Sequence, residues 1–345
     1  MTVKKPQTTT LIDTFSEGYA AVNRRPWLVL VPILLNLYLW FGAQLSFAPL
    51  INDLHAALRL LQRDTPGQSE LEAQYSDQVL ALGQVDMRQQ FLSQHAIFNF
   101  IPTLTMYVVG ASDASSGAPG VPLVQAVPRL IDPQRSDTIY VSSLGGALLA
   151  FVLINALALP LSAAFLTQLA AAVRGDWPPL ATWLRRVGRA SLALLGYIGV
   201  FAGVMLALGL PFLFLSFLLI YLSPALGLLA LSLLTIALFW ARIYVGFAPE
   251  AIAVSGVGPL QAMYASFNIV RRNFWGTLGF LALYYVITIG SGVIWLSLAH
   301  ASTAGLIVAI VGSAYLSSGL LAARMAFYRE RLRRWQGAVA PARPS

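Results

Sequence analysis

One stretch of the chain, residues 191–245, decides the fold class. It reads SLALLGYIGVFAGVMLALGLPFLFLSFLLIYLSPALGLLALSLLTIALFWARIYV, and its single charged side chain is Arg242. About 20 apolar residues in a helix cross the hydrocarbon core of a bilayer, so this run is too long for one span. We place a break at YLSP (221–224), because a break at GLP (209–211) leaves one helix barely long enough and the other excessive. Pro211 then becomes a kink, which a helix bundle tolerates.

The composition of the whole chain supports a lipid environment. Hydrophobic residues make up 57% of the 345 residues and charged residues 10%, whereas a soluble domain carries about a quarter charged residues. We therefore expect an all-α, polytopic transmembrane helix bundle of about six spans. The predicted spans are residues 27–51, 141–173, 191–220, 225–247, 275–298 and 303–328.

The placement of charge predicts the orientation of these spans. Basic residues beside spans tend to stay in the cytoplasm, and one side collects 17 of the 22 basic residues with 5 of the 14 acidic ones. That side holds both termini, so we expect both to be cytoplasmic. The segments outside the spans are then a cytoplasmic amphipathic helix at 1–26, an external helical hairpin and loop at 52–140, a cytoplasmic amphipathic segment at 174–190, a cytoplasmic amphipathic helix at 248–273 and a basic tail at 329–345.

An alternative interpretation of the N-terminus is a twin-arginine export signal, because Arg24 and Arg25 precede the first apolar run. That run of about 25 residues is longer than the roughly 7 to 15 of a signal peptide, and five further spans follow it. An integral membrane protein is the simpler interpretation.

Several reaction classes lack the side chains that they need. The chain has no cysteine, which excludes disulfides, thiolate metal sites and cysteine nucleophiles. Its lysines, Lys4 and Lys5, lie near the N-terminus, so neither a P-loop lysine nor a buried Schiff-base lysine is available. The histidines, His55, His95 and His300, have no metal-ligand spacing and are interpreted as isolated polar residues in exposed loops. We expect no enzyme, no metal and no cofactor.

A unit made of a short amphipathic helix, arginines and then a span recurs three times. We expect each helix to lie in the cytoplasmic interface, with its arginines at anionic lipid headgroups and its tryptophan at headgroup level. Specific recognition of a lipid or partner is the alternative to simple anchoring. In the first copy Thr14 and Glu17 fit a capping box. The candidate interface residues are Arg24, Arg25 and Trp27 in the first copy, Arg185 and Arg186 in the middle one, and Arg271, Arg272 and Trp275 in the last.

The last copy of this unit resembles a known pattern. GPLQAMYASFNIVRRNFWGTLGF (258–280), which follows FAPEAIAVSGV (247–257), is similar to a pattern in bacterial six-span membrane proteins, including the membrane domain sometimes fused to glycerophosphodiester phosphodiesterases. The resemblance covers mainly residues 245–290 and implies an all-helical, multi-pass protein of the bacterial cytoplasmic (inner) membrane. It does not imply phosphodiesterase activity, because that chemistry belongs to a separate soluble domain that we do not find in this sequence.

The predicted spans contain few polar side chains from which a pathway could be built. Interhelical hydrogen bonding is the simpler role for them, and a substrate site is the alternative. We expect Arg242 and Arg324 to snorkel near cytoplasmic ends, with an interfacial pair of Arg242 and Glu250 as the alternative. Gly199 and Gly203 predict close helix packing. The candidate intramembrane polar residues are Asn36, Gln44, Asn155, Gln168, Arg242 and Glu250.

Periodicity in the external segment predicts two amphipathic helices, at 53–63 and about 69–91. The run at 97–109 is too short to span, and we interpret it as dipping into the interface. Residues 111–133, rich in Gly, Ser and Pro, are predicted to be a loop.

These observations favour a non-enzymatic integral membrane protein that acts as a scaffold, assembly helper or envelope-maintenance factor. The alternative is a permease or lipid-handling transporter with an uncharged pathway. The expected partners are anionic membrane lipids, together with a membrane-protein partner or a second copy of the chain. We do not expect nucleic acid, because most of the basic residues lie beside spans.

Overall fold

The computed structural model describes residues 10–62, 80, 82–97, 100–104, 106–109, 124–127, 131 and 137–339. This part of the chain is mostly helical and contains five helices long and apolar enough to cross a membrane, which confirms the predicted all-α, multi-pass class. They are α6 (Leu144–Arg174), α7 (Leu180–Leu222), α8 (Pro224–Val245) continued by α9 (Ala248–Ser255), α11 (Phe274–Ala301) and α12 (Thr303–Val339).

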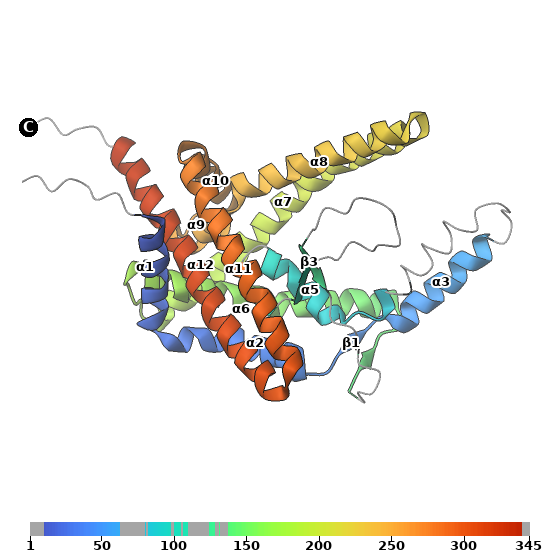
Figure 1. The fold of residues 1–345 in the computed structure, drawn as a ribbon, viewed down its shortest axis with the longest axis horizontal. Helices are drawn as coiled ribbons and strands as arrows, with labels where there is room; N and C mark the ends of the chain where they lie inside the picture. Colours follow the sequence, from blue (N-terminus) through green and yellow to red (C-terminus); the bar gives the residue numbers. More distant parts are fainter. Residues whose placement is uncertain are drawn as a thin grey trace, which may run out of the picture.

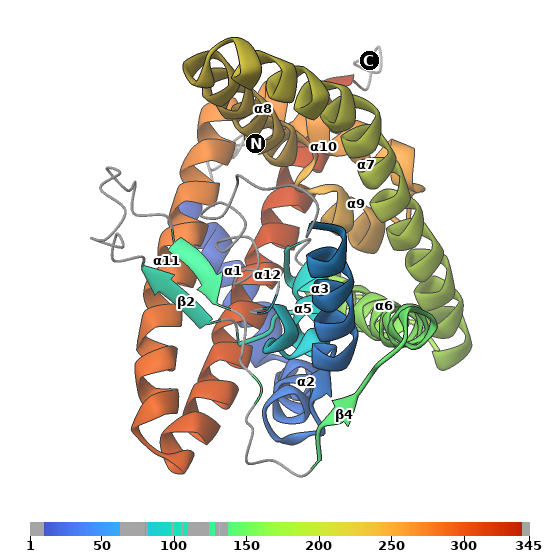
Figure 2. The same cartoon turned by 90° about the vertical axis from the view of Figure 1, so that its right-hand side faces the viewer.

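The long helices form two hairpins that diverge (Figure 1). Helices α7 and α8 make one arm, α11 and α12 make the other, and the arms meet beside α9 and α10 (Pro259–Arg272). A view turned by 90° shows α3 (Ala48–Gln62) and α5 (Met87–Ile97) in the space between the arms (Figure 2). The base where the arms meet is therefore where side chains from both hairpins come together.

Four phenylalanines form the aromatic centre of this base. Phe280 of α11 stacks on Phe327 of α12 with ring centroids 4.5 Å apart, and on Phe15 with centroids 5.0 Å apart. Phe247, in the turn between α8 and α9, stacks on Phe327 at 5.6 Å. All four side chains are buried, so this cluster fixes the turn before α9 against the second arm.

The predicted break between the third and fourth spans is confirmed. Ser223 has extended backbone angles, and Pro224 occupies the first turn of α8. The predicted segment 174–190 does not stand apart from the span at 191–220, because Pro179 caps a single helix α7 that begins at Leu180. Pro211 lies inside this helix, as expected.

The predicted first span, residues 27–51, is wrong in its length. A short 3₁₀ turn (Pro26–Val29) leads into α2 (Leu30–Phe41), and the helix ends there because Gly42 is extended. The apolar helix at 26–41 is shorter than the other spans. Beyond it, β1 (Leu45–Ser46) pairs in parallel with β4 (Ile139–Tyr140), and α3 follows.

A buried ion pair explains why α2 ends early. Arg88 lies 2.8 Å from Asp86, and both side chains are buried. The guanidinium of Arg88 donates to the carbonyl oxygens of Tyr38 and Leu39, in the last turn of α2, at 3.3 and 3.4 Å. Asp86 accepts from the backbone N–H of Leu45 at 3.3 Å. Hydropathy cannot show this termination, because its donors lie more than 40 residues away.

The external segment differs from its prediction in several places. Helix α3 begins before residue 53, and most of the predicted helix at 69–91 lies outside the described residues, although α5 covers its end. Strand β2 (Met106–Val109) pairs antiparallel with β3 (Val124–Val127). Because β3 lies inside the predicted loop at 111–133, that prediction is wrong for residues 124–127.

Residues 100–104 enter the protein interior. Phe100, Ile101 and Leu104 are buried against the helices, and the N–H of Leu104 donates to Asn36 at 2.6 Å. Irregular backbone among spanning helices is tolerated where protein covers it. The run predicted to dip into the interface at 97–109 therefore packs, in its described central part, inside the bundle.

Helix α1 (Leu11–Asn23) packs on α12 and does not present its apolar stripe to lipid. Phe15 and Val22 are buried within the protein, and Tyr19 donates a hydrogen bond to the carbonyl of Leu316. Its capping box is formed by Thr10 and Asp13 and not by the predicted Thr14 and Glu17, because the helix begins four residues earlier.

The predicted cytoplasmic helix at 248–273 is two helices, α9 and α10. They are separated at Gly256, which adopts a left-handed conformation with φ of 66°, a backbone that favours glycine. Gly258 and Pro259 start α10 as expected. At the far end, α12 continues through much of the predicted tail at 329–345, to Val339.

Close helix packing occurs at glycines other than the predicted pair. A Cβ at Gly18 of α1 would lie 2.4 Å from the backbone nitrogen of Ala323 in α12, whereas a Cβ at Gly199 or Gly203 would meet nothing within 4 Å. The predicted packing at Gly199 and Gly203 is thus wrong within the described chain.

We expect Gly18→Ala to lower the free energy of unfolding by about 1–3 kcal/mol, because α1 must move away from Ala323 to admit the methyl group. The matched control, Gly199→Ala, should be neutral or stabilise by up to about 1 kcal/mol through helix propensity. Unfolding of both variants in detergent, followed by circular dichroism, measures this difference. Equal stability of the two variants would contradict the α1–α12 contact.

Candidate functional site

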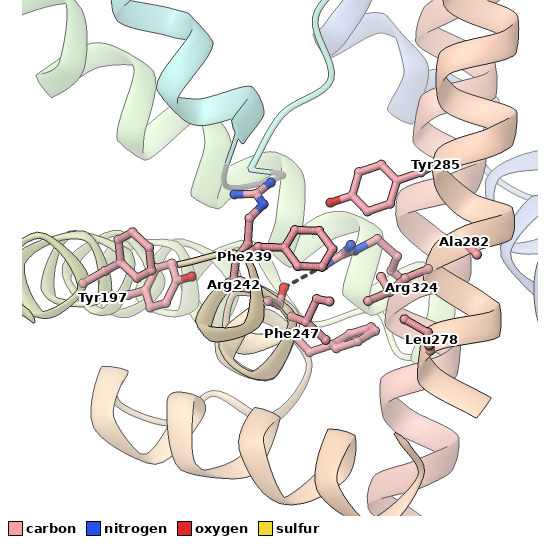
Figure 3. Close-up of a pocket in the computed structure, with 12 residues that line it drawn as sticks. Tyr197, Phe239, Arg242, Phe247, Leu278, Ala282, Tyr285 and Arg324 are labelled. Atoms are coloured by element: carbon pink, nitrogen blue, oxygen red, sulfur yellow. Dashed lines mark hydrogen bonds between the residues drawn. The ribbon is translucent and has the colours of Figure 1, made fainter. Parts of the chain in front are cut away.

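A cavity of about 270 Å³ lies at the base of the two arms (Figure 3). Its walls are largely aromatic and aliphatic, and two arginines reach it, Arg242 from α8 and Arg324 from α12. Both arms are needed to build it. The lining residues are Tyr197 and Phe201 of α7, Phe239, Arg242 and Ile243 of α8, Gly246 and Phe247 of the turn that follows, Leu278, Leu281, Ala282 and Tyr285 of α11, and Arg324 of α12.

Arg324 connects three elements at one wall of this cavity. Its Nε donates to Glu250 Oε1 at 2.5 Å, and its Nη2 donates to the carbonyl oxygen of Gly246 at 2.6 Å. The side chains of Arg324 and Glu250 are 2% and 0% exposed. The rings of Phe247 and Tyr284 lie 4.9 and 5.2 Å from the guanidinium carbon. The cation is therefore enclosed by a carboxylate, a carbonyl and two aromatic faces.

This arrangement has a strong energetic consequence. Charges taken out of water need both a counter-ion and hydrogen bonds, and removing one partner of a buried pair typically costs about 3–5 kcal/mol. Gly246 is the residue at the C-terminal cap of α8, so Arg324 also supplies a donor that the helix end lacks. The second oxygen of Glu250, Oε2, is buried and accepts no hydrogen bond from the described residues.

The partner of Glu250 corrects the sequence interpretation. The alternative pair of Arg242 and Glu250 is wrong, and so is the snorkelling expected for Arg324. Helix α9 turns into the protein because Phe247 is held by the aromatic cluster, which carries Glu250 from a supposed cytoplasmic loop to α12. The sequence does contain one sign that Glu250 is buried, because it is the single charged residue in the apolar run FAPEAIAV (247–254).

Most of the polar side chains predicted within the membrane lie in separate places, away from the cavity between the arms. Asn36 and Gln44 are buried near the break after α2, and Asn36 accepts the hydrogen bond from Leu104. Gln168 lines a different, smaller cavity beside Trp177 and Trp183. Of the six candidates, Arg242 lines the cavity between the arms and Glu250 holds its other arginine. The aromatic lining residues carried no sequence signal that separates them from lipid-facing ones.

The arginines predicted to contact lipid headgroups have mixed environments. Arg185 and Arg271 are exposed, and Arg24 donates to a carbonyl of its own helix. Arg25 and Arg272 lie over the rings of Trp177 and Trp335, and Arg186 pairs with Asp176. Trp27 packs edge-on against Trp177, whereas Trp275 is 79% exposed. Exposure at Arg185, Arg271 and Trp275 is compatible with the predicted interface.

A second polar cluster contradicts the prediction that His95 lies in an exposed loop. His95 is buried on α5, with Nε2 3.2 Å from Asn155 Oδ1 and Nδ1 3.4 Å from Ser162 Oγ. A neutral ring protonated on Nε2 donates to Asn155 and accepts from Ser162. These residue types also occur in hydrolases, but Ser162 is 0% exposed, so we interpret the cluster as packing between α5 and α6. No group of three or more His, Asp or Glu side chains in the described ranges could share a metal ion.

Burial lowers the pKa of His95 below its ordinary value of 6.5 and outweighs the opposing hydrogen bond with Asn155. The stability that comes from a neutral ring is therefore fully present above pH 6.5 and is lost as the pH falls below it. We expect the free energy of unfolding to decrease between pH 7 and pH 5, and His95→Gln to reduce this decrease. His300→Gln, at an exposed position, is the control. Identical pH profiles for wild type and His95→Gln would contradict the burial.

Comparisons of the chain with protein-family models, with curated proteins and with solved structures found no match. The functional assignment therefore depends on the geometry of the cavity and its arginines.

Proposed function

We propose that this integral membrane protein handles lipid, by holding an anionic amphiphile with its apolar part in the cavity between the two arms. The observation that carries the proposal is the combination of an apolar wall with two arginines, Arg242 and Arg324, among the residues that line one cavity. An amphiphile has the matching combination of an acyl chain and a charged group. The pathway differs from the uncharged one expected from the sequence, because two arginines lie on it.

The placement of the cavity supports a ligand that arrives from the bilayer. Its walls belong to helices α7, α8, α11 and α12, each of which is long and apolar enough to lie in a membrane. Burying apolar surface gains about 0.8 kcal/mol per methylene group. An acyl segment of a few methylene groups would thus bind in the cavity with useful affinity.

The electrostatics favour an anionic ligand. Glu250 neutralises Arg324, and the other charged group on the cavity wall is a second cation, Arg242, so the wall retains a positive charge. Arginine binds phosphate and carboxylate through paired N–H donors. A ligand with a negative group at the arginines and an apolar chain along α11 satisfies both parts of the site.

A second candidate function is the scaffold or assembly role. The observation that favours it is the arm formed by α7 and α8, whose apolar side chains are mostly exposed along its length, a surface that suits a membrane-protein partner. This second candidate includes three expectations from the sequence. They are the resemblance to bacterial six-span membrane proteins, the lack of enzymatic activity and the placement of both termini in the cytoplasm.

Filling the cavity tests the lipid-handling proposal. Ala282 lines it, whereas Leu283, the next residue of α11, does not. The larger side chain of Ala282→Phe should fill the space of roughly two methylene groups of the ligand. Because each buried methylene group contributes about 0.8 kcal/mol, we expect about tenfold less lipid to copurify with this variant. Leu283→Phe should retain wild-type lipid. Mass spectrometry of lipid extracted from purified protein makes the measurement.

Two results would contradict the proposal. One is equal lipid retention by wild type and Ala282→Phe, and the other is an equal loss in both variants. In either case, a membrane-protein partner that stays with both variants in mild detergent would favour the scaffold function.

A further inference from the structure

A second cavity, of about 430 Å³, lies beside the C-terminal end of α9 and shares no lining residue with the cavity between the arms. Its lining residues come from the C-terminal part of α6 and the segment after it, from the first turns of α7 and from the end of α9. Its charged lining residues are Arg174, Asp176, Arg186 and Arg189. The lining thus contains three arginines and one carboxylate.

Arg174 has a structural role in this cavity. Its Nη1 donates to the carbonyl oxygens of Ala253 and Val254 at 3.1 and 2.9 Å, and its Nε donates to Asp176 at 2.9 Å. The two carbonyls belong to the last turn of α9. Arg174 therefore fixes the end of α9 and is largely committed to protein partners.

Arg186 and Arg189 have N–H donors that protein partners do not use and that a ligand could engage. Arg186 makes one hydrogen bond of 3.1 Å to Asp176, although a guanidinium carries five N–H donors. Arg189 makes no hydrogen bond or ion pair within the described chain. The two residues are three positions apart on α7, a spacing that places side chains on the same face of a helix.

Asp176 is the one carboxylate among the residues that line this cavity, and it pairs with Arg174 and Arg186. Burial alone would raise the pKa of this carboxyl, but the hydrogen bonds from Arg186 and Arg174 outweigh burial and lower it. The carboxylate therefore remains charged at neutral pH. It pairs with Arg174 and Arg186, which leaves Arg189 without a counter-ion among the described residues. The cavity retains an excess of positive charge on its α7 side.

We infer that this cavity binds a phosphate group, held between Arg186 and Arg189. A phosphate has enough oxygens and negative charge to engage two guanidinium groups, each through paired N–H donors. The size of the cavity admits a group much larger than water. The phosphate belongs either to a soluble phosphate compound or to a lipid headgroup, and both sources require the same two arginines. This inference is independent of the lipid proposed for the other cavity.

Removing Arg189 tests the site with a charge-matched control. Arg333 of α12 is exposed, as Arg189 is, but does not line the cavity, so Arg333→Gln removes the same charge elsewhere. The full chain in neutral detergent is titrated with inorganic phosphate by calorimetry. In a second arm it is placed in nanodiscs of phosphatidylcholine with or without phosphatidic acid, and retention of phosphatidic acid is measured. Arg189→Gln should weaken binding about tenfold, the effect of losing one charged hydrogen bond, and Arg333→Gln should not.

Each outcome decides the inference. Saturable binding of inorganic phosphate that depends on Arg189 supports a soluble ligand. Retention of phosphatidic acid that depends on Arg189, without binding of inorganic phosphate, supports a lipid headgroup. No binding in either arm, or equal weakening by Arg333→Gln and Arg189→Gln, overturns the proposed site.

Discussion

The structure depends on the hydrogen bonds that buried and partly buried arginines give to helix C-termini. The last carbonyls of a helix have no partner within it, and an unsatisfied polar group away from water costs several kcal/mol. Arg324 donates to Gly246 at the end of α8 while Glu250 neutralises it. Arg88 donates to the carbonyl of Leu39 in the last turn of α2, Arg174 to the last carbonyls of α9, and Arg329 to the carbonyl of Val173 at the end of α6. Four helix ends are thus closed by side chains from other parts of the chain.

These bonds give α9 its role in the molecule. Glu250, near its start, is tied to α12, and its last carbonyls are tied to Arg174. The cavity between the arms borders the turn before α9, and the cavity of Arg189 borders its end. One short helix held at both ends therefore separates the two proposed ligand sites. Arginines that a charge count places on the cytoplasmic side of the membrane, such as Arg174 and Arg324, therefore include some that hold the interior together.

Much of the helix arrangement could be predicted from the sequence, because hydropathy and breakers act locally. Ser223 and Pro224 separate α7 from α8, and Gly258 with Pro259 starts α10, as their residue types predict. The early end of α2 could not be predicted, because its donor, Arg88, is remote in sequence. Neither could the cavity and the buried Glu250–Arg324 pair, since aromatic and charged residues on spans look alike whether they face lipid or protein.

The most direct test is a double-mutant cycle on the free energy of unfolding with Glu250→Gln, Arg324→Met and both together. Each single variant should lose about 3–5 kcal/mol, because one buried charge is left unpaired, and the double variant should lose much less than the sum. The exposed pair of Glu330 and Arg334 on the same helix is the control and should show a coupling of about 0.3–0.5 kcal/mol. Additive losses at Glu250 and Arg324, or coupling of Glu250 to Arg242 instead, would contradict the account.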